Sequence, residues 1–309
     1  MEAHESKKEK SMKVSEKFRI EKRIAHNGKV NIARHMPQLT SIIATQSSSG
    51  LIYIFDFSKQ SSKSEQANPE LTLIGQKKEG NGLSWNEKNK GKLLGSSKDG
   101  LICMWNVESA SKLYSSLDPI VKYEAHKASV RSVEWNMHVA DVFASVGSDK
   151  QLLIWDARQK SSMPVYQINA HTDDILSVSF NPFKEYFLAT SSADKTIAIW
   201  DMRNLQTKQH SLKHHQAEVL SVSWAPFNEA LLASASRDRR VFIWDLSQVR
   251  KTQTEEEASE GPPELLFIHG GHRGRVNDIS WNPNQDLMIA SVAEDGILQL
   301  WQMVIYNNK

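Results

Sequence analysis

The sequence predicts an all-β chain folded as a β-propeller, and three observations support this prediction. Six segments share one template, in which a leading residue is followed 29 positions later by a closing aromatic residue. Within each segment apolar and polar residues alternate, as they do in β-strands. The segments recur at steps of 50, 50, 45, 44 and 57 residues, so insertions fall between units and not within them. Short sheets of this kind bury both faces only when they stack around an axis.

Each unit is expected to form one blade of three or four strands. The leading residues are His26, Gln76, His126, His171, His215 and His272, and the closing aromatics are Phe55, Trp105, Trp155, Trp200, Trp244 and Trp301. The units lie near 24–59, 74–108, 124–158, 169–203, 213–247 and 270–303. Their Trp-Asp endings match the WD-repeat pattern of about 40–45 residues. The sequence leaves open whether the propeller is a six-bladed ring or a shortened seven-bladed one.

The propeller is expected over residues 18–303, between two tails. Residues 1–17 are charged and poor in apolar residues, so this tail is predicted to be disordered, and residues 304–309 form a short C-terminal tail. From Phe18 the chain alternates, with Ile20 and Ile24 apolar. This alternation predicts an outer strand that closes the ring against the last blade.

Composition argues against several function classes. The chain has 38 basic and 36 acidic residues, so its net charge of +2 does not suit a protein built to coat nucleic acid or an anionic membrane. No apolar run approaches the roughly 20 residues that a membrane span needs. No phosphate-binding glycine loop or metal-ligand spacing is present, so no cofactor or metal is expected. The one cysteine, Cys103, lies in an apolar run and is predicted to be a buried, inert thiol.

Four units carry the residue types of a hydrolase triad. The sets, each with its closing tryptophan, are His126, Ser145, Asp149 and Trp155; His171, Thr190, Asp194 and Trp200; His215, Ser234, Asp238 and Trp244; and His272, Ser291, Asp295 and Trp301. A nucleophile is needed once and not at four equivalent positions. These residues are therefore predicted to form a buried hydrogen-bond chain in each blade, and the protein is not expected to be an enzyme. The first two units lack the complete set and are expected to form softer blades.

An acidic insertion separates the fifth and sixth units. Over residues 250–264 two basic residues stand against five glutamates, and Pro262 and Pro263 stiffen the exit of the segment. The segment is either a solvated loop or an acidic lip for a basic partner.

At this insertion the sequence resembles the histone-binding WD-repeat family. The resemblance rests on EGPPELLFIHGGH, NPELTLIGQKKEGNGLSWN, SADKTIAIWDMRNLQTKQHS and SWNPNQDLMIASVAEDGILQLWQM, and runs from about Lys22 to Met303. The family comprises the retinoblastoma-binding proteins, the small subunit of chromatin assembly factor and the accessory subunit of type B histone acetyltransferase. It implies a non-catalytic scaffold that is nuclear and can also occur in the cytoplasm. Such a scaffold presents core histones three and four to assembly, acetyltransferase, deacetylase and methyltransferase complexes.

The family's first histone site is a side groove between a long N-terminal helix and the acidic loop, and it holds a basic amphipathic histone helix. The resemblance assigns histone binding to the loop residues Glu255, Glu256, Glu257, Glu260 and Glu264. Ser259 stands where an acid is usual. Residues 1–17 do not resemble the family's helix, and the family's first blade has no counterpart.

The family's second site, on the top face of the ring, holds a basic histone tail. The top-rim positions lie five residues after each leading residue, at Asn31, Asn81, Arg131, Leu176, Leu220 and Asn277, and Glu79 and Glu294 match the family's acidic positions. Family members place an acid where Arg131 and Lys29 stand, and aromatics where Asn81 and Leu220 stand. The positive charges of Arg131 and Lys29 would repel a cationic tail at the top-face opening of the ring. Tail binding at this site is therefore predicted to be weakened or lost.

Two further functions compete with the histone scaffold. Arg158 and Arg203 end Trp-Asp-x-Arg motifs that resemble those by which WD-repeat substrate receptors dock on the adaptor of cullin-type ubiquitin ligases. Residues 1–25 hold eight basic residues against five glutamates, which would suit nucleic-acid binding with a steep salt dependence. Sequence-specific nucleic-acid binding is not expected, and the chain on its own is expected to be a monomer.

Overall fold

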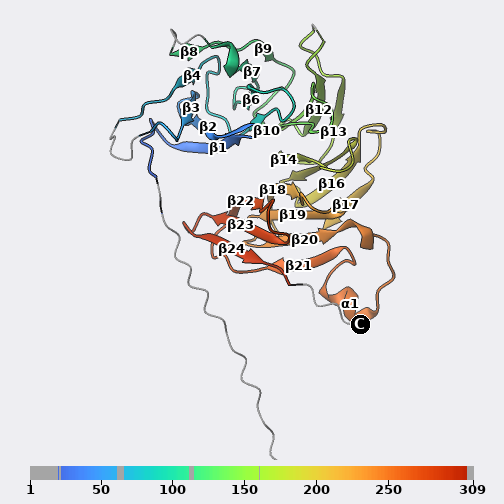
Figure 1. Ribbon diagram of the computed structural model, residues 1–309. Coiled ribbons are helices and arrows are strands. Elements are labelled where there is room, and N and C mark those ends of the chain that lie inside the picture. Colours follow the sequence, from blue (N-terminus) through green and yellow to red (C-terminus); the bar gives the residue numbers. More distant parts are fainter. Residues whose placement is uncertain (1–19, 21, 61–65, 111–114, 160, 305–309) are drawn as a thin grey trace, which may run out of the picture.

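Six small β-sheets fan out around a common axis (Figure 1). The structure, a computed structural model, describes residues 20, 22–60, 66–110, 115–159 and 161–304. Within these residues the chain is all-β apart from one short helix and two 3-10 turns, so the predicted fold class is confirmed. The predictions for residues 1–17 and 305–309 lie outside the described residues.

We number the sheets as blades 1 to 6 in chain order. Blade 1 contains β1 (Val30–Met36), β2 (Leu39–Ser47), β3 (Ile52–Asp56), β4 (Leu71–Leu73) and β8 (Ser116–Leu117); blade 2 contains β5 (Leu83–Trp85), β6 (Lys92–Ser96), β7 (Ile102–Asn106) and β9 (Val121–Tyr123); blade 3 contains β10 (Val130–Trp135), β11 (Val142–Gly147), β12 (Gln151–Asp156) and β13 (Tyr166–Asn169). Blade 4 contains β14 (Ile175–Phe180), β15 (Phe187–Ser192), β16 (Thr196–Asp201) and β17 (His210–Lys213); blade 5 contains β18 (Val219–Trp224), β19 (Leu231–Ser236), β20 (Val241–Asp245) and β21 (Leu265–His269); blade 6 contains β22 (Val276–Trp281), β23 (Met288–Ala293) and β24 (Leu298–Gln302). The 3-10 turns η1 (Val107–Ser109) and η2 (Leu246–Gln248) follow β7 and β20, and helix α1 (Glu255–Glu260) lies in the acidic insertion.

The core consists of apolar layers between successive blades. In each layer the inner strand of one blade packs on the inner strand of the next, from β1 to β5 and on to β22. Three inner-strand tryptophans also bond to the preceding blade through their indole N–H, because Trp85 donates to the Arg34 carbonyl (3.0 Å), Trp224 to Ser179 (3.1 Å) and Trp281 to Ser223 (3.1 Å). The repeat therefore fixes both the fold of a blade and its stacking on its neighbour.

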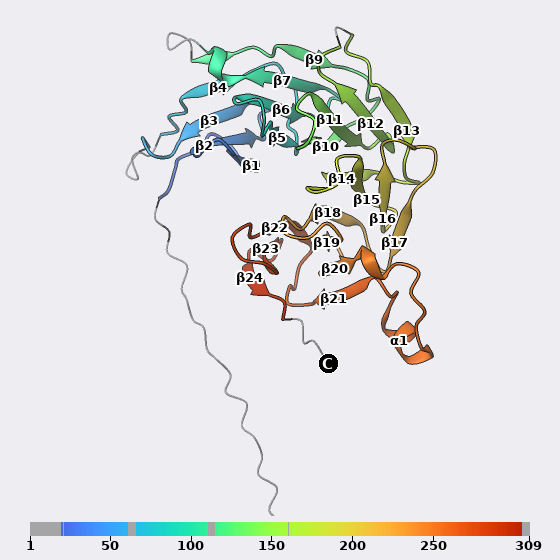
Figure 2. The ribbon, with the colours of Figure 1, turned by 45° about the vertical axis from the view of Figure 1, so that its right-hand side comes forward.

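The ring is open between blade 6 and blade 1, as Figure 2 shows. The two blades are linked at their inner strands by an ion pair between Arg34 and Asp278 (3.6 Å). Their facing sheets do not pack against each other, as the exposed side chains show. Leu298 and Leu300 of blade 6 are about half exposed. His35 of blade 1 is also exposed, although it occupies the position of the buried inner-strand tryptophans.

The asparagines that directly follow the inner strands show the same opening. Asn136 and Asn181 donate across to the following blade, to the carbonyls of Glu185 and Glu229, both at 2.9 Å. The equivalent Asn282 of blade 6 instead turns back to the sulfur of Met288 (3.3 Å). Over the described residues the propeller therefore has six blades, with an opening between blade 6 and blade 1.

The predicted closing strand is not formed by the part of it that the structure describes. Ile20 and residues 22–29 have no strand structure, and Phe18, Arg19 and Glu21 lie outside the described residues. His26 instead packs on blade 1, with its ring edge-on to Tyr53 (5.2 Å between centroids) and its Nε2 bonded to Thr45 Oγ1 (2.9 Å). The segment around His26 thus packs on the face of blade 1 that carries Tyr53 and Thr45, and its described residues add no strand to blade 6.

Candidate functional site

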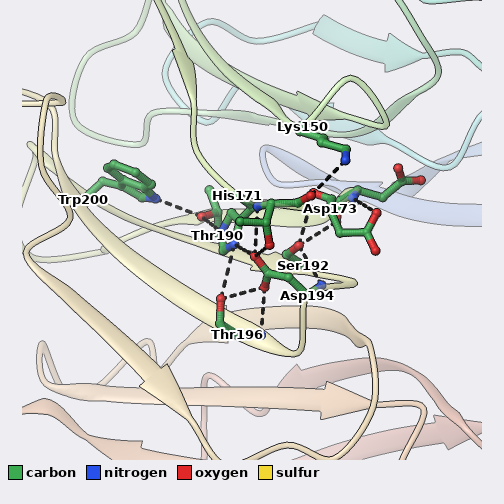
Figure 3. A network of polar contacts seen from close by, with 10 residues as sticks. Lys150, His171, Asp173, Thr190, Ser192, Asp194, Thr196 and Trp200 are labelled. Carbon is green, nitrogen blue, oxygen red and sulfur yellow. Dashed lines mark hydrogen bonds and ion pairs between the residues drawn. The ribbon is translucent and has the colours of Figure 1, made fainter.

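The repeated His, Ser or Thr, Asp and Trp residues form one buried hydrogen-bond chain per blade. In blade 4 the Trp200 indole donates to Thr190 Oγ1 (2.9 Å), His171 Nε2 bonds the same oxygen (2.8 Å), and His171 Nδ1 bonds Asp194 (2.9 Å), as Figure 3 shows. Blade 3 repeats this chain through Trp155, Ser145, His126 and Asp149, and blade 5 repeats it through Trp244, Ser234, His215 and Asp238.

Blade 6 holds a stretched version of the chain. Trp301 donates to Ser291 (3.1 Å) and His272 Nε2 bonds the same hydroxyl (2.7 Å), but His272 Nδ1 lies 3.8 Å from Asp295 and has no hydrogen-bond partner. Burial lowers the pKa of His272. The last blade is therefore less completely bonded than blades 3 to 5.

Blades 1 and 2 replace the chain with other partners, as their divergent residues predict. In blade 2 Gln76 donates to the Gly95 carbonyl (2.8 Å), and the Trp105 indole donates to the Ile74 carbonyl (3.1 Å). Backbone oxygens here take the place of the missing hydroxyl.

These sets are structural because their hydroxyls cannot meet a substrate. Ser145, Thr190, Ser234 and Ser291 are fully buried. Burial is the largest single influence on Asp149 and acts to raise its pKa, but the hydrogen bond and charge of His126, together with the backbone N–H groups of Lys127 and Gln151, outweigh it and leave this pKa below its usual range. The carboxylates therefore stay charged, bonded and enclosed. Within the described ranges, no cluster of three or more His, Cys, Asp or Glu side chains could hold a metal.

Burial also accounts for the lone thiol. Cys103 is fully buried in β7, and this burial raises the pKa of its thiol to about 12.

Among the helices of the described residues, none is long and apolar enough to cross a membrane.

The acidic insertion folds into helix α1, which projects from the side of blade 5 (Figure 2). Thr254 caps the helix, since its hydroxyl accepts the Glu257 N–H (3.2 Å) while the Glu257 carboxylate accepts the Thr254 N–H (2.8 Å). This capping box satisfies amide groups that a six-residue helix would otherwise leave unbonded. It leaves the carboxylates of Glu255, Glu256 and Glu260 exposed on the helix.

Glu264, the fifth acid of the predicted histone site, is placed differently. It is buried at the end of the loop, where its carboxylate bonds His210 Nε2 of β17 (2.8 Å), and its backbone carbonyl accepts the Asp245 N–H (2.8 Å). A carboxylate enclosed in this way anchors the loop and is not available to a partner. Sequence reasoning missed His210 because nothing in the repeat marks it as a loop contact.

A hollow of about 520 Å³ lies between the loop and the outer strand of blade 5. Its lining joins Glu257, Glu260 and the loop prolines to Leu266 and Phe267 of β21. The side of the hollow that α1 forms is thus acidic, and the side that β21 forms is apolar. The apolar run 265–267 was predicted only as a resuming strand, and its place under the acidic helix depends on the loop fold.

On the top face, the predicted rim residues occupy a repeated β-bulge. The register between the first two strands shifts by one residue in five blades, and the extra residue is Asn31, Arg131, Leu176, Leu220 or Asn277. A bulged residue has no partner across the sheet, so its side chain is turned out of the strand pairing. Asn81 of blade 2 lies just before β5 and is exposed.

The acids of the top face are paired within the molecule. Glu79 bonds Lys98 and the Asn31 amide (2.8 Å), and the lysine contact above all holds its pKa below the usual range. Asp174 lies 3.4 Å from Arg131, and Glu294 lies 3.1 Å from Arg275. This face therefore offers a cationic tail carboxylates that already have cationic partners.

The two Trp-Asp-x-Arg motifs form local ion pairs. Arg158 Nη2 lies 2.6 Å from Asp156, and Arg203 Nη2 lies 2.6 Å from Asp201. Arg203 also stacks over the Tyr186 ring (5.1 Å to the centroid). Both arginines are exposed, and each stabilises the end of its own blade.

Comparison with known proteins supports the propeller and the repeat. A model described as the EIPR1 β-propeller matches residues 118–244, and a model of the WD domain, G-beta repeat, matches residues 263–302. A chain in a structure titled "Crystal Structure of Mitotic Checkpoint Complex" superimposes with a TM-score of 0.69 at 22% identity, covering 88% of this chain and 73% of that one. The resemblance to the histone-binding family rests on sequence motifs alone. The fold, the repeated hydrogen-bond chain and these matches together make this chain a WD-repeat β-propeller of six blades.

Proposed function

We propose that this chain is a non-catalytic histone-binding scaffold of chromatin assembly and histone-modifying complexes, acting in the nucleus. In this proposal the acidic loop 250–264 holds histones three and four. The observation that carries the proposal is the placement of exposed glutamates on α1 beside an apolar hollow on blade 5. The sequence resemblance to the histone-binding family supports the choice of partner.

The hollow suits a basic amphipathic helix. Such a helix carries lysine and arginine along one face and apolar side chains along the other. Its apolar face would pack on Leu266 and Phe267, while its cations would meet Glu260 at the edge of the hollow and the exposed Glu256 on the same helix. The apolar contact would supply most of the affinity, and the acidic helix would steer approach and fix orientation.

The top face is not the main histone site in this proposal. Its acids are paired with Lys98, Arg131 and Arg275, so binding a cationic tail would require breaking these ion pairs. Among the described residues, Glu255, Glu256 and Glu260 of α1 form no ion pair, and they lie on the surface.

The proposal is tested by titrating the purified, folded chain with the histone three–four dimer. A variant with Glu255, Glu256 and Glu260 changed to Gln removes exposed charge and keeps the capping box and the buried Glu264. We expect submicromolar binding by the wild type and a loss of about tenfold or more in the variant, at a few tenths to 1 kcal/mol for each exposed charge.

The matched control changes Glu70, Glu87 and Glu124, three exposed glutamates outside the loop, to Gln. It alters the net charge by the same amount and is expected to bind as the wild type does. Equal weakening by both variants would mean that only net charge matters, and no binding by the folded wild type would refute the histone proposal.

A further inference from the structure

The acidic loop begins with a tight turn that carries an arginine where glycine is favoured. The N–H of Lys251 donates to the Gln248 carbonyl (3.0 Å), which closes a four-residue turn. Val249 has φ −52° and ψ 131°, and Arg250 has φ +66°, so the turn is of type II. The third position of such a turn needs a positive φ, which glycine adopts without strain and arginine does not. Residues held in this conformation cluster at functional segments, so the charged side chains of the turn are candidates for a role in binding.

The turn places a positive charge in the hollow beside α1. Gln248 and Lys251, the two end residues of the turn, both line the hollow. Glu257 and Glu260 of the helix belong to the same lining. Lys251 is exposed, and among the described residues it forms no ion pair. Its ammonium group is therefore available to a bound partner.

The basic and acidic parts of the lining come from different segments of the loop. The turn directly follows β20 and η2 of blade 5, whereas α1 projects away from β20 and β21 (Figure 2). Leu266 and Phe267 of β21 complete the lining with apolar side chains. The hollow therefore offers a partner an apolar contact, a basic contact at the turn and an acidic contact at the helix.

We propose that Lys251 is a specificity-determining residue of this hollow, which selects an amphipathic helix with segregated charges. This inference rests on the proposed function and names the charge pattern of its partner. The partner carries basic side chains over the stretch beside α1, and acidic or neutral side chains over the stretch beside the turn. A helix that is basic along its whole length brings a cation against Lys251, and this like-charge contact weakens its binding.

Lys251 acts in this proposal by excluding partners. The exposed glutamates Glu255, Glu256 and Glu260 alone would attract any basic segment, because attraction between charges in solvent depends little on the shape of the partner. Discrimination between partners needs a repulsive contact with the wrong partner as well as an attractive one with the right partner. A lysine within the lining supplies that contact.

Two helical peptides of identical composition test the proposal. Each is about 18 residues long, with leucines along one face and equal numbers of lysines and glutamates along the other. In the segregated peptide, made in both orders, one half carries the lysines and the other half the glutamates, whereas in the alternating peptide the two charges alternate. A third peptide carries lysines in place of all the glutamates. Titrated against the full chain, the segregated peptide in one of its orders should bind most tightly.

Substitution of Lys251 should reverse this ranking. Lys251→Glu replaces the cation with an anion, so it should bind the all-lysine peptide about five- to tenfold more tightly than the wild type does, and the segregated peptide more weakly. Lys251→Gln should lie between the two. Lys122→Glu, at an exposed lysine of β9 in blade 2, changes the net charge equally and should rank the peptides as the wild type does. Because every protein meets the same peptides, differences in peptide helicity cancel.

The role of Lys251 and the histone proposal fail in different ways. If Lys251→Glu ranked the peptides as the wild type does, the role of Lys251 would be overturned, even with the histone three–four dimer bound by the wild type. If the wild type ranked the peptides as expected without binding the dimer, the role of Lys251 would stand and only histones would be refuted as the partner. A wild type that bound none of the peptides would overturn the selection of a helix.

Discussion

One residue on an inner strand carries a charge state that the repeat does not predict. Glu134 of β10 occupies the position that is serine in blades 2, 4, 5 and 6, and its carboxylate accepts the Phe180 N–H of blade 4 (2.7 Å). The protein surrounding the carboxylate raises its pKa to about 8. The neutral acid is therefore the favoured form in the folded protein near neutral pH.

This raised pKa predicts a pH-dependent gain of stability for Glu134→Gln. Below the ordinary carboxyl pKa, both folded and unfolded chains are protonated, and the substitution should be nearly neutral, because the amide oxygen can still accept the Phe180 N–H. Between that value and about 8 the unfolded chain ionises while the folded chain does not, so the wild type loses stability as pH rises. At pH values above this range the variant should be more stable by on the order of 1 kcal/mol or more. Thermal unfolding of both proteins at acidic and at mildly alkaline pH measures the difference, and a pH-independent difference would contradict the prediction.

The sequence predicted the roles of residues well where the same residue types recur at equal spacing in several units. The equal spacing of His171, Thr190, Asp194 and Trp200 in several units is enough to identify their hydrogen-bond chain. Glu264 has no counterpart in other units, and the family resemblance grouped it with the exposed acids of the loop. Its burial follows from a contact with a strand 54 positions earlier, which no local pattern reveals.

At the scale of the element, the acidic loop is held in place by its end and not by its helix. Helix α1 has no buried residue, so its own turn adds little stability. The loop is fixed where Glu264 meets His210, and where Gly261, at φ +150°, passes close to Leu265 and His214. The positive φ favours glycine at this position, and a Cβ there would also lie 2.8 Å from the Leu265 side chain, which would have to shift.

His210→Ala is therefore expected to release the loop and weaken histone binding, although this residue is not expected to touch the histone. The substitution leaves the buried Glu264 carboxylate without its imidazole partner and should cost about 1–3 kcal/mol of stability. Glu264→Gln keeps an oxygen in reach of His210 and should be milder. Hydrogen exchange over residues 261–267 and histone titration of both variants test this order. If Glu264→Gln abolished binding while His210→Ala left it intact, Glu264 would be a histone contact and not an anchor.

At the scale of the molecule, the sequence predicted six blades but not how the ring ends. Each repeat specifies its own strands and the apolar inner-strand residues that pack on the blade before, and in three blades a tryptophan also bonds across, so the five interfaces between successive blades follow from the template. The sixth interface depends on two blades whose inner strands start 246 positions apart, at Val30 and Val276. There His35 replaces the inner-strand tryptophan, and Asn282 bonds Met288 of its own blade. Closure is a property of the whole ring, and a repeat pattern does not encode it locally.

An open ring predicts a gradient of stability along the chain, which two matched substitutions can measure. Trp155 of blade 3 is buried between two neighbouring blades and donates to Ser145 (2.8 Å), whereas the equivalent Trp301 of blade 6 is half-buried and donates to Ser291 at 3.1 Å. Replacing either tryptophan with phenylalanine removes the same N–H and the same indole atoms. Trp155→Phe should cost about 1–3 kcal/mol, because Ser145 and the packing around it are enclosed, and Trp301→Phe should cost clearly less. Chemical denaturation of the two variants measures the costs, and native-state hydrogen exchange should show faster opening in blades 1 and 6 than in blades 3 to 5. Equal costs would mean that blade 6 is as well covered as the central blades. In that case the face of blade 6 that carries Leu298 and Leu300 would be covered in solution, contrary to the open ring.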